Sequence, residues 1–269
     1  MTAIASLPMY DFDELRARTD ALWRLLARAM RHAGVEDVPD SLTRQAHYHQ
    51  LWSRRDLLFS QTCGYPMVHE YRYVLRPVAV PRYSAPGCNG SEYCSAILVR
   101  EETEHREIGA FRGAVCAINS PVSQSGYNAL RALVAPLAEN GCFFSKVKLT
   151  GSHVGSVVSV AAGEADICAV DCVTYALLNR YRPSALQGTR VMSYTPCCPG
   201  LPFVTRADLD ADQFERLRAA VHEALGDTQG EAIRAALLIE GVDDTEFEDY
   251  QVVLEMESAA AASGYSEIR

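Results

Sequence analysis

The chain has 269 residues, of which 48% are hydrophobic and 22% are charged, and its formal net charge is −9. This composition is typical of a globular protein with one large domain or two small ones. The only lysines are Lys146 and Lys148 and there is no basic cluster, which argues against a nucleic-acid partner. The apolar stretches are too short for a membrane-spanning helix.

A first strand is expected at residues 4–8, almost directly after Met1, with no basic and apolar segment before it that would form a signal peptide. We therefore expect a cytoplasmic protein, or a periplasmic one if a leader has been removed. A helix should follow, because leucine and alanine recur at helical spacing as far as Gly34. Asp11 and Glu14 have the spacing of a capping box at the start of that helix.

A second strand is expected at residues 56–60, and an extended segment follows at residues 74–80. Pro77 and Pro81 interrupt this segment. Because proline lacks the N–H group that a central strand needs, the segment is predicted to be a crossing between lobes rather than a central strand.

The middle of the chain alternates strands with helices. Strands are expected at residues 113–118, 145–149 and 166–170, and each is followed by a turn and a helix. This alternation predicts parallel strands joined by right-handed crossovers.

The last part of the chain is predicted to be mainly helical, at residues 212–225, 231–239 and 247–262. Together with the two crossings of the chain, this pattern predicts an α/β protein with two lobes. One lobe would be discontinuous, and the other would be inserted into it. The predicted ranges are 1–78 plus 194–269 for the first lobe and 79–193 for the second, with a hinge between them.

Small and hydrogen-bonding residues gather where the strands are expected to end, which is where ligands bind in open α/β sheets. Gly126 and Gly151 would let the backbone approach a ligand closely. The hydroxyl donors in the two turns are Ser123, Ser125, Thr150 and Ser152. Since these turns contain no lysine or arginine, the N-termini of two helices would hold an anion. The alternative is that Ser125 and Ser152 only cap their own helices.

Four further side chains are candidates for contact with the ligand. His153 could donate a hydrogen bond to an anion, or it could be a solvated residue of a first helical turn. Asp171 could accept a proton from a protonated ligand, bind an ammonium group on it, or cap the following helix. Tyr10 and Tyr65 could place their phenol groups against the ligand, or only pack in the core.

The nine cysteines are an odd number, and no CxxC pair occurs. We expect most of them to be free thiols buried as small hydrophobic residues in a reducing compartment. Cys88 and Cys94 could bridge across a loop, and Cys197 and Cys198 are adjacent. No spacing of cysteine and histidine matches a zinc pattern, so no metal site is predicted.

Five short motifs occur in order along nearly the whole chain: SQTCGYP at 60–66, SQSG at 123–126, TGSH at 150–153, AVD at 169–171 and PGLP at 199–202. Together they resemble the phosphate, phosphite and phosphonate substrate-binding proteins of ABC importers, a branch of the type 2 periplasmic-binding fold. The resemblance implies a ligand cleft between two lobes, a small anionic ligand that is passed to an ABC permease, no catalytic residue and no cofactor. The ligand-binding residues that it implies are Tyr10, Tyr65, Ser123, Ser125, Gly126, Ser152, His153 and Asp171.

A cytoplasmic enzyme on the same fold is the alternative, such as a chorismate dehydratase or a thiamine-pyrimidine synthase. His153 and Asp171 would then be the candidate catalytic residues, but no nucleophile and base can be paired from the sequence. The adjacent Cys197 and Cys198 resemble the cysteine-rich motif of the pyrimidine synthases only faintly. A third hypothesis, the ligand-sensing domain of a regulator, lacks a pair of DNA-binding helices.

Overall fold

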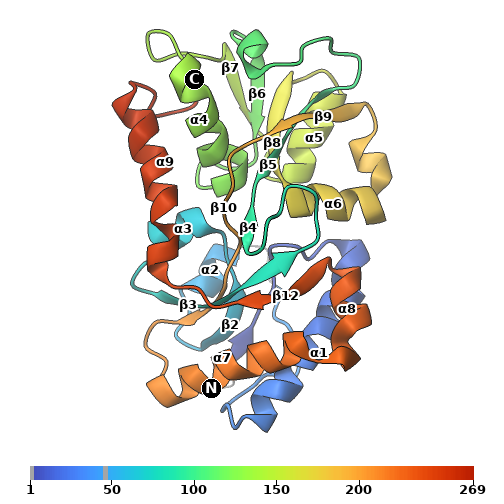
Figure 1. The fold of residues 1–269 in the computed structure, drawn as a ribbon, viewed down its shortest axis with the longest axis vertical. Helices are drawn as coiled ribbons and strands as arrows, with labels where there is room; N and C mark the ends of the chain where they lie inside the picture. Colours follow the sequence, from blue (N-terminus) through green and yellow to red (C-terminus); the bar gives the residue numbers. More distant parts are fainter. Residues whose placement is uncertain (1–2, 45–47) are drawn as a thin grey trace. The chain divides into compact units, whose positions relative to one another are not determined.

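The computed structural model describes residues 3–44 and 48–269, and the backbone contacts divide the chain into two units. Unit 1 consists of Met1–Ser84 and Pro199–Tyr250, and unit 2 of Ala85–Cys198 and Gln251–Arg269. Both units combine a five-stranded sheet with helices (Figure 1), which confirms the predicted α/β class. Within the described part of the chain, no helix is both long enough and apolar enough to cross a bilayer.

Unit 1 contains a sheet with the strand order β1-β2-β11-β3-β12. Its strands are β1 (Ile4–Ala5), β2 (Leu57–Gln61), β3 (Leu75–Tyr83), β11 (Phe203–Arg206) and β12 (Ile239–Asp243). Strands β1 and β2 are parallel, and the other pairs are antiparallel. The sequence did not predict β12, because residue 239 was assigned to the end of a helix.

The prediction that residues 74–80 form a crossing rather than a central strand is wrong. These residues belong to β3, which pairs with β11 on one side and with β12 on the other. Pro77 lies opposite Val204, next to a register shift, and Pro81 lies opposite Val242, one pair away from a second shift between Ile239 and Gly241. Such irregularities let a sheet accommodate residues that have no N–H group to donate.

The helices of unit 1 are α1 (Arg16–His32), α2 (Tyr48–Trp52), α3 (Gly64–Val68), α7 (Ala211–Gly226) and α8 (Glu231–Ala236). Helix α1 confirms the predicted helical spacing, since Leu22, Leu26 and Met30 are buried on one face. Gly34 ends the helix with a φ of +76°, a conformation that favours glycine.

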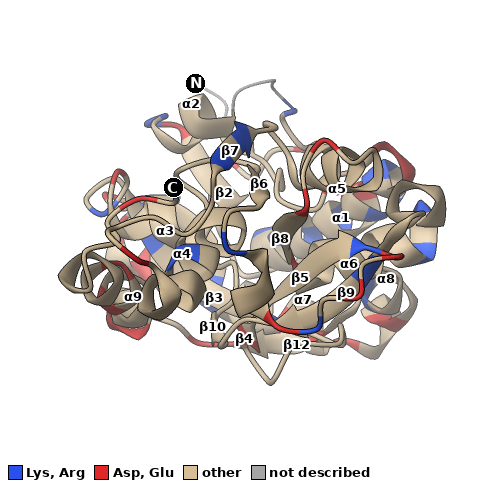
Figure 2. Cartoon of the chain, turned by 90° about the horizontal axis from the view of Figure 1, so that it is seen from above, with Lys and Arg blue, Asp and Glu red and all other residues tan. Residues whose placement is uncertain are grey.

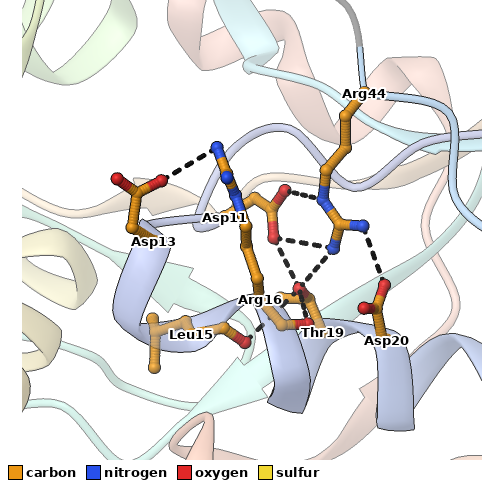
Figure 3. A network of polar contacts seen from close by, with 7 residues as sticks. All are labelled: Asp11, Asp13, Leu15, Arg16, Thr19, Asp20 and Arg44. Carbon is orange, nitrogen blue, oxygen red and sulfur yellow. Dashed lines mark hydrogen bonds and ion pairs between the residues drawn. The ribbon is translucent and has the colours of Figure 1, made fainter.

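The predicted capping box of Asp11 and Glu14 does not form. A 3₁₀ turn, η1 (Asp13–Leu15), precedes α1, and neither element has a side-chain cap. Asp11 instead accepts hydrogen bonds from Thr19 Oγ1 at 2.5 Å and from Arg44 Nε at 2.5 Å (Figure 3). These contacts connect the segment after β1 to α1. The carboxylates of Asp11 and Asp20 raise the pKa of the Arg44 guanidinium above its usual value.

Unit 2 contains a sheet with the strand order β7-β6-β8-β5-β9. Its strands are β5 (Ser95–Arg100), β6 (Val115–Ile118), β7 (Lys146–Leu149), β8 (Ile167–Asp171) and β9 (Thr189–Tyr194). Strand β6 is parallel to both β7 and β8, as the strand–helix alternation predicted, whereas β5 is antiparallel to β8 and β9. A separate two-stranded sheet pairs β4 (Glu92–Tyr93) with β10 (Cys198–Pro199).

The helices of unit 2 are α4 (Ala129–Val134), α5 (His153–Ala161), α6 (Cys172–Tyr181) and α9 (Gln251–Ala262), with a π-helical turn, η3 (Gln124–Asn128), before α4. Unit 2 also contains the short 3₁₀ turns η2 (Ile108–Phe111), η4 (Ala135–Leu137) and η5 (Pro183–Leu186), and unit 1 contains η6 (Thr228–Gly230) and η7 (Phe247–Tyr250).

Helix α9 packs within unit 2, beside α4 (Figure 1), whereas the sequence assigned residues 251–269 to the discontinuous lobe. Arg131 of α4 carries much of this packing. Its guanidinium donates to Ser266 O at 2.7 Å and to Asn128 Oδ1 at 2.5 Å, and it lies 3.3 Å from the carboxylate of Glu257. A helical pattern in the sequence cannot show which unit a terminal helix joins.

We expect Arg131→Met to lower the free energy of unfolding by about 2–3 kcal/mol, because Asn128 would keep a buried oxygen without a donor and Glu257 would lose its cation. Urea unfolding followed by circular dichroism measures this change. The matched control is Arg106→Met, an exposed residue of the same unit, which should shift stability by less than about 0.5 kcal/mol. Equal losses in the two variants would contradict the role of Arg131.

Candidate functional site

Three turns follow the parallel strands β6, β7 and β8 of unit 2. Because β6 lies between β7 and β8 and is parallel to both, the carboxyl ends of the three strands meet at one edge of the sheet. The turns begin at Asn119, at Thr150 and after Asp171. The structure therefore brings the predicted site residues of unit 2 to a single edge.

Ser123 caps the turn that follows β6. Its Oγ accepts a hydrogen bond from Gly126 N at 3.1 Å, and its extended backbone is typical of an N-cap. The alternative hypothesis that Ser125 is the cap is therefore wrong, since Ser125 lies inside η3. Ser95 of β5 holds the turn in place, because its Oγ donates to Ser125 O at 2.9 Å.

Ser125 and His153 join the turn after β6 to the start of α5. The Oγ of Ser125 lies 3.1 Å from His153 Nε2, within hydrogen-bond distance. Burial lowers the pKa of His153 to about 4, although the nearby carbonyl of Ala169 acts in the opposite direction. His153 is half-buried, and with this pKa its ring is neutral at physiological pH.

Position 126 requires glycine because there is no room for a side chain, and not because of its backbone conformation. A Cβ atom at this position would overlap Asn119 Oδ1 and lie 3.1 Å from His153 Cε1. Within the described residues, Asn119 Oδ1 is buried and has no hydrogen-bond partner. Asn119 was not among the predicted site residues, although an amide directly after a buried strand was a usable signal.

The turn after β7 uses its hydroxyl groups internally. Thr150 Oγ1 donates to Ile118 O at 3.0 Å and lies 2.7 Å from Ser156 Oγ, so Thr150 supports the turn. Ser152 caps α5, because its Oγ accepts from Gly155 N at 3.0 Å. Gly151 has a φ of +81°, which accounts for glycine here.

Asp171 is the last residue of β8 and the N-cap of α6. Its side chain is buried, and Oδ1 accepts a hydrogen bond from Thr174 N at 2.9 Å. The capping alternative for Asp171 is therefore confirmed. Asp171 also lies opposite Ser95 in the sheet, which places it beside the strand residue that holds the Ser125 turn.

Tyr10 and Tyr65 belong to unit 1, and both are buried. The ring of Tyr10 meets the edge of the Tyr83 ring at 5.4 Å, and Gln61 Nε2 donates to Tyr83 OH at 3.1 Å. The ring of Tyr65 lies 4.4 Å from that of His69. These contacts agree with a packing role, and a ligand contact for either tyrosine stays a prediction.

The helix N-termini of the site differ in charge. Helix α6 begins at the carboxylate of Asp171, which already occupies its positive end. Helix α5 begins at a neutral serine, and its first N–H groups have no partner inside the helix. Figure 2 shows acidic and basic residues interspersed over the helices, and the turns at 119–126 and 150–153 contain neither lysine nor arginine. Of the two, α5 is better suited to an anion.

Comparison with known proteins places the chain among binding proteins. Residues 4–250 match the protein family described as the ABC transporter, phosphonate, periplasmic substrate-binding protein. No curated protein matches the sequence significantly.

Several solved structures have the same fold. A binding-protein component of an ABC phosphonate transporter from Pseudomonas aeruginosa matches with a TM-score of 0.73 and 14% identity, over 97% of this chain and 87% of that one. PhnD1 from Prochlorococcus marinus, solved in complex with methylphosphonate, matches with a TM-score of 0.76 and 15% identity, over 96% and 97% of the two chains. A Xanthomonas citri protein bound to ATP matches with a TM-score of 0.72 and 16% identity, over 98% of each chain. These likenesses confirm the predicted two-lobed periplasmic-binding fold.

The lowered pKa of His153 predicts a pH-dependent contribution to stability. Because the folded-state pKa is about 4 and the usual value is 6.5, the unfolded chain binds a proton between these values that the folded chain does not. The contribution of neutral His153 is therefore complete above pH 6.5 and is lost as the pH falls towards 4. The loss should reach up to about 3 kcal/mol.

Urea unfolding at pH 7.5, 6, 5 and 4 measures this dependence, with His153→Gln as the comparison. Glutamine does not titrate and can still bond to Ser125 Oγ. The stability difference between the wild-type protein and His153→Gln should shrink as the pH falls. Parallel stability curves for the two proteins would contradict the lowered pKa of His153.

Proposed function

The chain belongs to the family of phosphonate periplasmic substrate-binding proteins of ABC transporters, and from that membership we propose that it binds a small phosphonate-like oxyanion for an ABC permease. The family consists of binding proteins rather than enzymes, and nothing supports the alternative of a dehydratase or a pyrimidine synthase. Since the family is periplasmic, a periplasmic location is part of the proposal.

The observation that carries the proposed ligand is the junction of the Ser125 turn with the start of α5. The 3.1 Å contact between Ser125 and His153 brings a hydroxyl and a neutral imidazole to the helix end that has no charged cap. Backbone N–H groups at such an end bind anions without a basic side chain. An anion at this point would accept from the N-terminus of α5 and from the Ser125 turn.

The carboxylate of Asp171 favours a ligand anion that still carries one proton. A fully ionised ligand would be repelled by a buried carboxylate at the same edge of the sheet, whereas a monoanion with one P–OH group can donate to it. Thr174 N occupies Oδ1, and a carboxylate has further acceptor capacity. We propose this second contact as a reason for the choice of a phosphonate or phosphate over a sulfate, which carries no proton at neutral pH.

The relatives support the choice of ligand. The Prochlorococcus marinus protein was solved with methylphosphonate, and the Xanthomonas citri protein with ATP and with chloride. We therefore propose methylphosphonate as the first ligand to test. Contacts from Tyr10 and Tyr65, and a ligand position between the two lobes, belong to the same proposal.

Ser152→Asp tests the proposal. Aspartate is as good an N-cap as serine and suits the helix dipole, so the melting temperature should stay within about 2 °C of the wild-type value. The added carboxylate would occupy the positive end of α5, and the affinity for methylphosphonate should fall at least 100-fold. Isothermal titration calorimetry measures the affinity, and thermal unfolding without ligand measures the stability.

Ser41→Asp is the control, because it adds the same charge at an exposed position of unit 1 and should keep wild-type affinity. Sulfate and succinate serve as comparison ligands for the wild-type protein. Retained affinity in Ser152→Asp would place the ligand elsewhere. A wild-type protein that binds neither methylphosphonate, phosphite nor phosphate would contradict the proposed function as a whole.

A further inference from the structure

Four cysteines of unit 2 gather outside the candidate anion site. Cys88 and Cys94 come from the segment around β4, Cys172 is the first residue of α6, and Cys197 precedes β10. The Sγ atoms of Cys88 and Cys172 are 3.5 Å apart. The thiol of Cys94 lies within hydrogen-bond distance of the thiols of Cys172 and Cys197.

All nine cysteines are free thiols in the structure. The bridge between Cys88 and Cys94 that the sequence left open is absent, because both thiols contact Cys172 instead. This arrangement brings together two residues that are 84 positions apart in the chain.

Gly87 shapes the loop so that both thiols reach Cys172. Its φ is +96°, and a Cβ atom there would lie 2.6 Å from Cys94 Sγ and 3.1 Å from Cys172 Cβ. A backbone bond from Cys172 N to Cys94 O, at 3.1 Å, fixes the start of α6 against the same loop. The backbone of the loop and the backbone at the start of α6 therefore hold the sulfur atoms close together.

We propose that Cys88 and Cys172 are a redox pair, which forms a disulfide in an oxidising compartment and ties the loop at 85–94 to the start of α6. Bond formation needs the two sulfur atoms to approach from 3.5 Å to about 2.05 Å, a shift that side-chain rotation and a small loop movement supply. The proposal does not depend on which ligand the protein binds.

The environment of the pair favours thiol–disulfide exchange. Cys172 stands at a helix N-terminus and accepts hydrogen bonds from the thiols of Cys88 and Cys94, which lowers the pKa of Cys172 and raises the pKa values of its two neighbours. Cys88 is half-buried and Cys172 is buried, so an external reagent reaches Cys88 first.

The oxidant is a small disulfide, such as oxidised glutathione. Cys88 passes its proton to the neighbouring Cys172 thiolate and attacks one sulfur of the reagent, which forms a mixed disulfide and releases one thiolate that takes up the proton from Cys172. The Cys172 thiolate then attacks the Cys88 sulfur and displaces the second thiolate. The two protein thiols lose two electrons and two protons, and one disulfide becomes two small thiols.

The link would act on the candidate site through the chain itself. Cys172 directly follows Asp171, whose carboxylate caps α6, so a disulfide at Cys172 restrains the turn that carries Asp171. A covalent link over 84 positions should also stabilise the folded state, because it removes much of the freedom of the unfolded chain.

The test is to oxidise the folded full-length protein with oxidised glutathione, alkylate the remaining thiols, denature the protein and digest it at acidic residues. Cleavage after Glu92 separates Cys88 from Cys94, and cleavage after Asp171 separates Cys172 from Cys168. A second digestion with trypsin cleaves after Arg190 and separates Cys172 from Cys197 and Cys198, which otherwise share one peptide. Mass spectrometry without reduction should find the peptides of Cys88 and Cys172 linked. The melting temperature should rise by roughly 5–10 °C and return after reduction.

Three variants decide between the possible pairs. Cys88→Ser should lose both the linked peptide and the rise in melting temperature, whereas Cys142→Ser, at an exposed position, and Cys94→Ser should keep both. A link that joins Cys94 to Cys172 or to Cys197 in the wild-type protein, with Cys88 alkylated, would overturn the assignment. Complete alkylation of all nine cysteines after oxidation would overturn the redox pair itself.

Discussion

Parallel pairing of β6 with both β7 and β8 is the constraint on which the candidate site depends. It forces three turns that are far apart in the sequence to lie at one edge of the sheet, so that Ser125 meets His153. The antiparallel pairing of β5 with β8 adds Ser95 opposite Asp171. Several polar groups there, Ser123, Ser152 and Asp171 among them, also cap local structure. The residues that stabilise the turns are therefore also candidates for binding the ligand. His153, which is neutral, adds a polar group to the site without adding a charge.

The sequence predicted those parts of the molecule in which local pattern and fold agree. The three strand–turn–helix repeats of unit 2 and the long helix α1 are examples, because strand ends, glycines and helical spacing all indicate the same elements. Prediction from the sequence failed where contacts between residues far apart in the chain determine the structure. Asp11 bonds to Thr19 and Arg44 instead of capping a helix, and β3 tolerates its prolines through irregular pairing with β11 and β12.

The candidate site shows the same division. Its turns could be located from the sequence, since serine and glycine follow β6 and β7 and an aspartate ends β8, but the role of each side chain could not. Ser123 rather than Ser125 is the cap, and Asn119 closes the space beside Gly126. The cysteine group could not be predicted from the sequence either, because Cys88 and Cys172 are 84 positions apart and meet only in the folded chain.

The return of the chain's last segment to unit 2 has a consequence for biosynthesis. Arg269 O accepts a hydrogen bond from Phe143 N at 2.6 Å, and α9 covers α4, so unit 2 needs the last residues of this sequence to be complete. Unit 1 likewise cannot be complete until residues 199–250 have been synthesised. Unit 2 can finish folding only after residues 251–269 have left the ribosome, and until then the apolar surface that Ala260, Tyr265 and Ile268 cover stays accessible to chaperones.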